Sequence, residues 1–219
     1  MSLTPRTLRI SGLSRPLGVA RSYEVDNPYW YSENNTHVID RDVIRLQAYH
    51  LLNLFHANHG LAYEHKFDDP NDTLGQLHQD FYLSEITRML VSIAVSVRML
   101  DDQLKGGKDS AAYVTFAGEV DTGDYIASYS EGADSKPRFS VREACNKILH
   151  AETVRPLFEE GDKPHASCEE SDEEYRWWYL TGEIELTGHR QKGGEWECCL
   201  YVPPFLDVVL EVVSFERAT

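Results

Sequence analysis

An uninterrupted helical repeat in the first half of the chain constrains the fold most. Apolar residues from Leu83 to Leu104 step by three and four positions without a miss, and Gly106-Gly107 follow. This spacing aligns side chains on one face of an α-helix, and glycine commonly ends a helix. The middle of the segment is apolar on nearly every side, which is typical of a helix packed by neighbours all round. The sequence therefore predicts a long central helix that forms the spine of the domain.

A second helix is predicted just before the central one, over residues 41 to 58. Asp40 or Asp42 can cap its start, and Gly60 is placed to end it. Its apolar residues repeat at helical spacing: Ile44, Ala48, Leu51 and Phe55. Together, the two helices predict a helical core for the domain.

The C-terminal part of the chain changes period from the helical spacing to the alternation of a strand. Apolar and polar residues alternate over 180–187 and again over 195–202, with the glycine-flanked segment 188–194 between them. Pro203-Pro204 then precedes an apolar run, and proline is tolerated at a helix start. We expect a β-hairpin followed by a final helix over 205–213.

These elements predict three regions. Residues 1–39 lack a sustained period and form an irregular N-terminal arm. Residues 40–155 form the helical core, with an insertion at 108–139 that holds only short β-like pieces such as 113–116. Residues 156–219 hold an acidic connection, the hairpin and the last helix, packed on the core. The predicted fold class is mainly α, a helical bundle with an insertion, a C-terminal β-hairpin and a final helix.

Charge and composition limit the classes of function. The chain has 219 residues, and its 36 acidic against 21 basic residues give a formal net charge of −15. This balance disfavours general binding to phosphate backbones, so no DNA partner is expected. No stretch approaches the roughly 18 apolar residues of a membrane span, and no apolar segment of a signal peptide follows the N-terminal basic residues. We expect a cytoplasmic protein without a membrane partner.

A short helix near residue 140 carries polar side chains that its own folding does not require. Ser140 and Glu143 have the spacing of a capping box, which starts a helix. Arg142, Asn146 and His150 follow at i, i+4 and i+8 and line up along one strip beside the apolar face. This strip is the predicted functional site.

The helix resembles the motif helix of the HEPN superfamily of helical bundles. Members carry an Arg followed four to six residues later by a His, often in the form R-N-x-x-x-H. Asn146 and His150 match the polar and His positions, whereas Cys145 stands where the Arg would be. Arg142 lies one turn before Asn146 on the same side of the helix.

The resemblance implies a metal-independent endoribonuclease without a cofactor, or a non-catalytic relative that binds RNA or a nucleotide, in a defence, toxin or stress system. Such proteins are often dimeric, so a homodimer is expected. His150 would transfer the proton, Arg142 would stabilise the developing charge and Asn146 would orient the His or a phosphate. Glu85, Arg88 and Lys147 are the expected binding residues around this site.

Two alternatives from other classes remain open. The missing adjacent Arg and the acidic balance favour a non-catalytic module that binds a protein partner. A metal-binding helical bundle is the other, because four histidines fall within sixteen residues and Glu85 with Asp101 or Asp102 would complete a site. The histidines are His50, His56, His59 and His65.

Overall fold

The computed structural model describes part of each of two compact units, Met1–His37 and Val38–Thr219. The described residues are 30–31, 36–37, 39–121, 125–131, 134–135, 139–168, 175–190 and 193–216. In the first unit, β1 (Trp30–Tyr31) and β2 (Thr36–His37) pair in antiparallel fashion. The rest of the predicted irregular arm lies almost wholly outside the described residues, and the elements below belong to the second unit.

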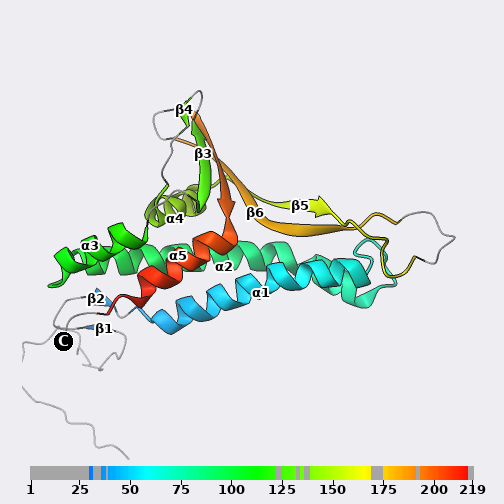
Figure 1. Cartoon of the computed structure of the whole chain (residues 1–219), viewed down its shortest axis with the longest axis horizontal. Coiled ribbons are helices and arrows are strands. Elements are labelled where there is room, and N and C mark those ends of the chain that lie inside the picture. Colours follow the sequence, from blue (N-terminus) through cyan, green and yellow to red (C-terminus); the bar gives the residue numbers. More distant parts are fainter. Residues whose placement is uncertain are drawn as a thin grey trace, which may run out of the picture. The chain divides into compact units, whose positions relative to one another are not determined.

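The second unit combines five helices with a five-stranded antiparallel sheet of order β4-β3-β7-β6-β5 (Figure 1). The helices are α1 (Arg41–Glu64), α2 (Thr73–Lys105), α3 (Ser110–Val120), α4 (Val141–His150) and α5 (Val202–Ser214). The strands are β3 (Ala127–Glu131), β4 (Asp134–Ser135), β5 (Thr153–Glu160), β6 (Trp178–His189) and β7 (Glu195–Tyr201).

The prediction of a mainly α bundle is therefore wrong, and the fold is mixed α and β. The predicted hairpin exists as β6 and β7, but β5 pairs along one side of it and β3 along the other. β5 carries Pro156 and a register shift between Pro156 and Phe158, as an edge strand tolerates. Its exposed residues blur the alternation that identifies a strand, which is why the sequence pattern missed it.

The central helix is confirmed and is longer than its apolar run, but the prediction that neighbours pack its middle all round is wrong, because Val91 and Val95 are exposed. α2 begins at Thr73, where Asp72 caps it by accepting a hydrogen bond from the Gly75 amide at 2.9 Å, and Gly106 follows its last residue. α1 continues past Gly60 to Glu64, because that glycine alone does not break a helix that packs along α2. The Gln47 amide of α1 donates to the Ser92 hydroxyl of α2 at 2.8 Å.

The segment 113–116, predicted as β-like, lies in α3 instead. Its Tyr113 is almost fully buried, and its hydroxyl donates to Asp101 of α2 at 2.9 Å. This tertiary contact outweighs the local preference of valine, tyrosine and phenylalanine for strands. The predicted insertion thus supplies a helix to the core and strands β3 and β4 to the sheet.

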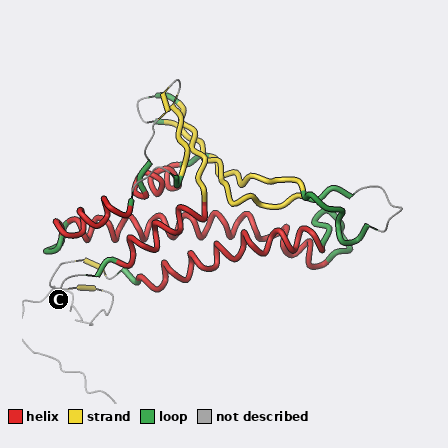
Figure 2. The backbone as a smooth tube through the Cα atoms, viewed as in Figure 1, coloured by secondary structure: helices red, strands yellow, loops and turns green. Residues whose placement is uncertain are grey.

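The core is formed by residues of the helices together with residues of the sheet. Figure 2 shows the strands on one side of the two long helices α1 and α2. One buried polar contact connects the layers, because the Asn58 side-chain oxygen of α1 accepts from the Leu180 amide of β6 at 2.6 Å. α5 starts with prolines in its first turn, as predicted, and packs its valines into the core. Of the helices described, none is both long and apolar enough to cross a membrane.

Candidate functional site

α4, the predicted motif helix, is held at its start by two carboxylates. The capping box is confirmed, since the Ser140 hydroxyl accepts from the Glu143 amide at 3.2 Å and the Glu143 carboxylate accepts from the Ser140 amide at 3.1 Å. Asp121, which follows α3, also accepts from the Val141 amide, at 3.0 Å. The N-terminal amides of α4 are thus bound within the protein.

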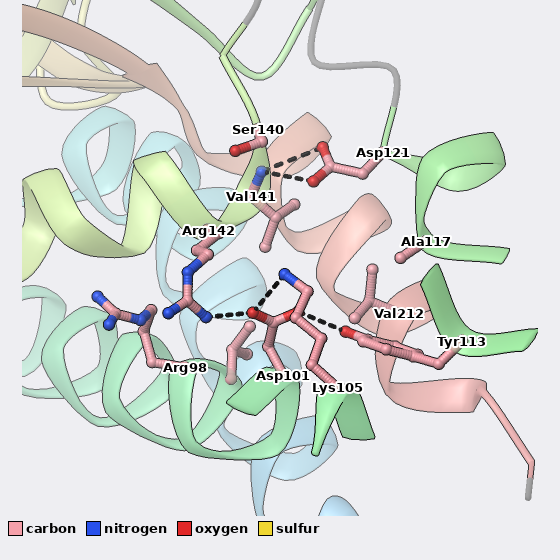
Figure 3. A pocket seen from close by; sticks show the side chains of 11 residues that line it. Arg98, Asp101, Lys105, Tyr113, Ala117, Asp121, Ser140, Val141, Arg142 and Val212 are labelled. Atoms are coloured by element: carbon pink, nitrogen blue, oxygen red, sulfur yellow. Dashed lines mark hydrogen bonds and ion pairs between the residues drawn. The ribbon is translucent and has the colours of Figure 1, made fainter. Parts of the chain in front are cut away.

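Arg142 points from α4 to the C-terminal part of α2 and forms an ion pair with Asp101 (Figure 3). It forms a second ion pair with Asp102. Its distance to the Asp102 carboxylate is 2.7 Å. Asp101 also accepts hydrogen bonds from Lys105 and Tyr113, each at 2.9 Å. One carboxylate of α2 therefore joins α2, α3 and α4.

The pKa of Asp101 reflects this set of donors. Burial acts to raise the pKa, but hydrogen bonds from Lys105, Tyr113 and Arg142 outweigh it and hold the pKa below its usual value. Burial and the hydrogen bond to Asp101 raise the pKa of the Tyr113 hydroxyl. Burial also raises the pKa of Asp121, against the hydrogen bond from Val141. Asp101 is therefore a carboxylate at neutral pH, and its charge is compensated locally.

A pocket of about 130 Å³ opens beside this network. Its polar lining residues are Arg98, Asp101, Lys105, Tyr113, Asp121, Ser140 and Arg142. Arg142 is the one predicted site residue in this lining; Asn146 and His150, both in the described part of α4, lie outside it.

The structure does not bring Arg142 and His150 together in that pocket. His150 is the last residue of α4 and is exposed, and Asn146 is half-buried between them. Eight residues of helix separate Arg142 from His150 by about 12 Å along the axis. The guanidinium is turned toward α2 and the imidazole lies at the opposite end of the helix.

The three predicted binding residues have partners of their own. The Lys147 ammonium lies 3.9 Å from the centre of the Trp196 ring and donates to the Tyr129 hydroxyl at 3.2 Å. It thereby attaches α4 to the sheet. Glu85 and Arg88 form an exposed ion pair on α2, with an Nε to Oε1 distance of 3.1 Å.

Arg98 of α2 is a pocket residue that the sequence analysis did not single out. Its Nε atom is buried and has no hydrogen-bond partner among the described residues. Burial raises the pKa of the Cys145 thiol to about 12, and the nearby Arg98 charge acts against this rise. The spacing along α2 alone could not have shown that Arg98 lies close to α4.

The histidines of the metal alternative are dispersed among other contacts. His65 pairs with Asp72 at 3.0 Å, and the His59 ring packs edge-on against Tyr179 with 4.5 Å between ring centres. In the ranges that the structure describes, no three His, Cys, Asp or Glu side chains are grouped so that they could hold a metal.

An apolar strip on α2, flanked by α1, is the other prominent surface of the second unit. Every large apolar residue of the strip is exposed, with Leu74 and Leu77 each at 55% and Phe81 at 56%. We call this the outer strip, and its apolar members are Leu74, Leu77, Phe81, Val91, Val95 and Met99. A groove of about 310 Å³ runs beside its first half, between the strip and Leu54 and Leu61 of α1.

No family model, curated protein or solved structure matches this chain. The class that the fold defines is a mixed α and β unit in which five helices pack with an antiparallel sheet. The HEPN resemblance of α4 stays a prediction.

Proposed function

We propose that the protein is a non-catalytic interaction module that binds a protein chain through the outer strip. The observation that carries this proposal is the row of exposed apolar side chains on α2, which form two groups on either side of Glu85 and Arg88. Water-exposed patches of this extent on a folded domain commonly mark a contact surface, because their burial by a partner is favourable. The groove beside Phe81 adds a hollow that can receive partner side chains.

The state of Arg142 supports a non-catalytic function. A guanidinium that stabilises a phosphoryl transition state needs to be available to that charge. Here Asp101 and Asp102 already neutralise it, and the imidazole of His150 lies about two turns away along α4. The overall charge of −15 also opposes the approach of RNA.

Photo-crosslinking in the native cell tests this function. A benzoylphenylalanine at position 81 is expected to give covalent protein adducts, because Phe81 is 56% exposed and lines the groove beside the strip. The matched control is the same residue at position 114, since Val114 is exposed to 52% on α3, away from the strip. Mass spectrometry of the adducts identifies the partner. Equal, low yields at both positions would contradict the proposal.

A metal-independent ribonuclease of the HEPN type is the second candidate, and one observation favours it. Arg98 reaches the neighbourhood of Cys145, the position where the motif's Arg would stand, and its Nε is unbonded within the described residues. A cation from α2 would then replace the one missing from α4, beside Asn146.

If this candidate is right, the purified protein cleaves RNA without a metal. Arg98→Ala and His150→Ala should then each lower the cleavage rate at least about a hundredfold, because each removes an electrostatic or proton-transfer group. Arg155→Ala is the control, because Arg155 forms an exposed pair with Glu185 on the sheet. Equal cleavage by all variants would show a contaminating nuclease, and no cleavage by the wild type would exclude this candidate.

A further inference from the structure

We infer that the partner on the outer strip is a second copy of this chain, packed through α2 in antiparallel orientation about a two-fold axis that passes between Glu85 and Arg88, at the level of residue 86. This inference rests on the proposed function, since it names the occupant of the same surface. Three observations support it: the order of residues along the strip, the charges at its centre and the shape of its two halves.

The apolar residues of the strip are spaced nearly symmetrically on either side of residue 86. With Glu85 and Arg88 at its centre, the strip follows a three-and-four spacing, and its apolar residues occupy an arc of about 100° on α2, as in a helix–helix seam. In an antiparallel pair with a two-fold axis at 86, residues at equal distances on either side face each other. Leu77 then meets Val95, and Phe81 meets Val91, so apolar residues meet apolar residues along the seam.

The charges at the centre select the antiparallel orientation. Glu85 and Arg88 flank position 86 and are the charged pair at the middle of the strip. In the antiparallel arrangement, Glu85 of each copy lies near Arg88 of the other, so two carboxylates and two guanidinium groups alternate around the axis. A parallel arrangement would place Arg88 against Arg88 and Glu85 against Glu85, which is repulsive.

The two halves of the strip also differ in shape in a complementary way. The groove lies beside the first half, near Leu77 and Phe81, whereas the second half carries Val91, Val95 and Met99, which are 38 to 41% exposed. The two-fold axis places the second half of each copy over the grooved half of the other. Its apolar side chains then cover a hollow that is lined by Leu54 and Leu61.

The size of the surface suits a stable dimer. From Leu74 to Met99 the strip extends about 37 Å at about 1.5 Å per residue. Together with the adjoining face of α1, from which Leu54 and Leu61 line the groove, the surface is roughly 18 to 20 Å wide, because the axes of two packed helices lie about 8 to 10 Å apart. The face is then on the order of 700 Å², close to the roughly 800 Å² that each partner buries in a typical stable complex.

Charge reversal at the axis tests the inference on the full chain. The wild type is expected to sediment at twice its 25.0 kDa mass. Glu85→Arg leaves only positive charge at the axis and is expected to weaken self-association roughly tenfold or more. Arg88→Glu leaves only negative charge at the axis and is expected to weaken self-association to a similar degree. The double variant E85R/R88E is expected to restore the dimer, because positive and negative groups again alternate around the axis.

The control variant Arg155→Glu breaks an equally exposed ion pair on the sheet and is expected to leave the mass unchanged. Circular dichroism checks that each variant is folded. A wild type that is monomeric at every concentration, or a dimer that neither single reversal weakens, overturns the inference.

The crosslink at position 81 separates failure of this inference from failure of the proposed function. An adduct between two copies that involves residues 91 to 95 supports the dimer. An adduct to a different protein overturns the dimer and leaves the interaction module intact. An adduct only to residues 1–37 of the same chain overturns both, because the strip then serves the chain's own first unit.

Discussion

Asp101→Ala is expected to lower the unfolding free energy by about 3 kcal/mol, the range for removing one partner of a buried ion pair. Asp101 is only 7% exposed and accepts from Lys105, Tyr113 and Arg142. Its removal leaves the Tyr113 hydroxyl buried without an acceptor and leaves Arg142 with Asp102 alone. In a domain of this size the melting temperature should fall by about 6 to 12 °C, measured by calorimetry.

Asp102→Asn is the matched control, because Asp102 also contacts Arg142 but its side chain is 57% exposed. The change should be below about 1 kcal/mol. The pH dependence provides a second measurement. Since the folded pKa of Asp101 lies below 3.8, its contribution is present above that pH and is lost as the pH falls further. Equal effects of the two substitutions would show that Asp101 does not join the three helices.

Gly188→Ala is expected to lower the unfolding free energy by about 2 to 3 kcal/mol through overpacking. Gly188 lies in β6 opposite Trp196 of β7. An added Cβ would lie 2.6 Å from the Trp196 ring and 2.9 Å from the His150 carbonyl oxygen. The ring must shift, and with it the surface on which Lys147 rests. Denaturant unfolding measures the loss, and the near-ultraviolet circular dichroism of tryptophan should change with it.

Gly118→Ala is the control, and it is expected to raise the unfolding free energy rather than lower it. Gly118 lies inside α3, and nothing lies within 4 Å of an added Cβ there. Alanine favours a helix interior over glycine, so this variant should gain about 0.5 to 1 kcal/mol. A neutral Gly188→Ala would mean that the sheet and α4 adjust around the methyl group without loss.

The sequence predicted well those elements whose pattern is local. The apolar repeat of α2, the capping box of α4 and the alternation of β6 and β7 each lie within one element, and the structure contains all of them. β5 and α3 were missed because distant partners determine them. β5 pairs with β6, and Tyr113 of α3 is buried against Asp101. Short segments with mixed patterns take the structure that their partners impose.

For the candidate site, too, the sequence predicted the local features but not the contacts between distant segments. The sequence placed Arg142, Asn146 and His150 on one helix, and α4 carries all three. It could not indicate that α2 directs carboxylates at Arg142, because that contact joins residues 41 positions apart. Arg98 and the outer strip could not be identified as functional features from the sequence, for a related reason. Exposure of an apolar helix face is a property of the packed molecule, and the same residues read equally well as core.

The ten residues of α4 have a consequence for how the molecule folds. A helix of this length is marginal in water when isolated, because nucleation is costly and few hydrogen bonds follow. Apart from its capping box, its stabilising partners come from other segments, namely Asp121, Asp101 and the aromatic rings beside Lys147. The motif helix therefore acquires order only when the surrounding chain has already assembled, and it should unravel together with that assembly rather than by itself.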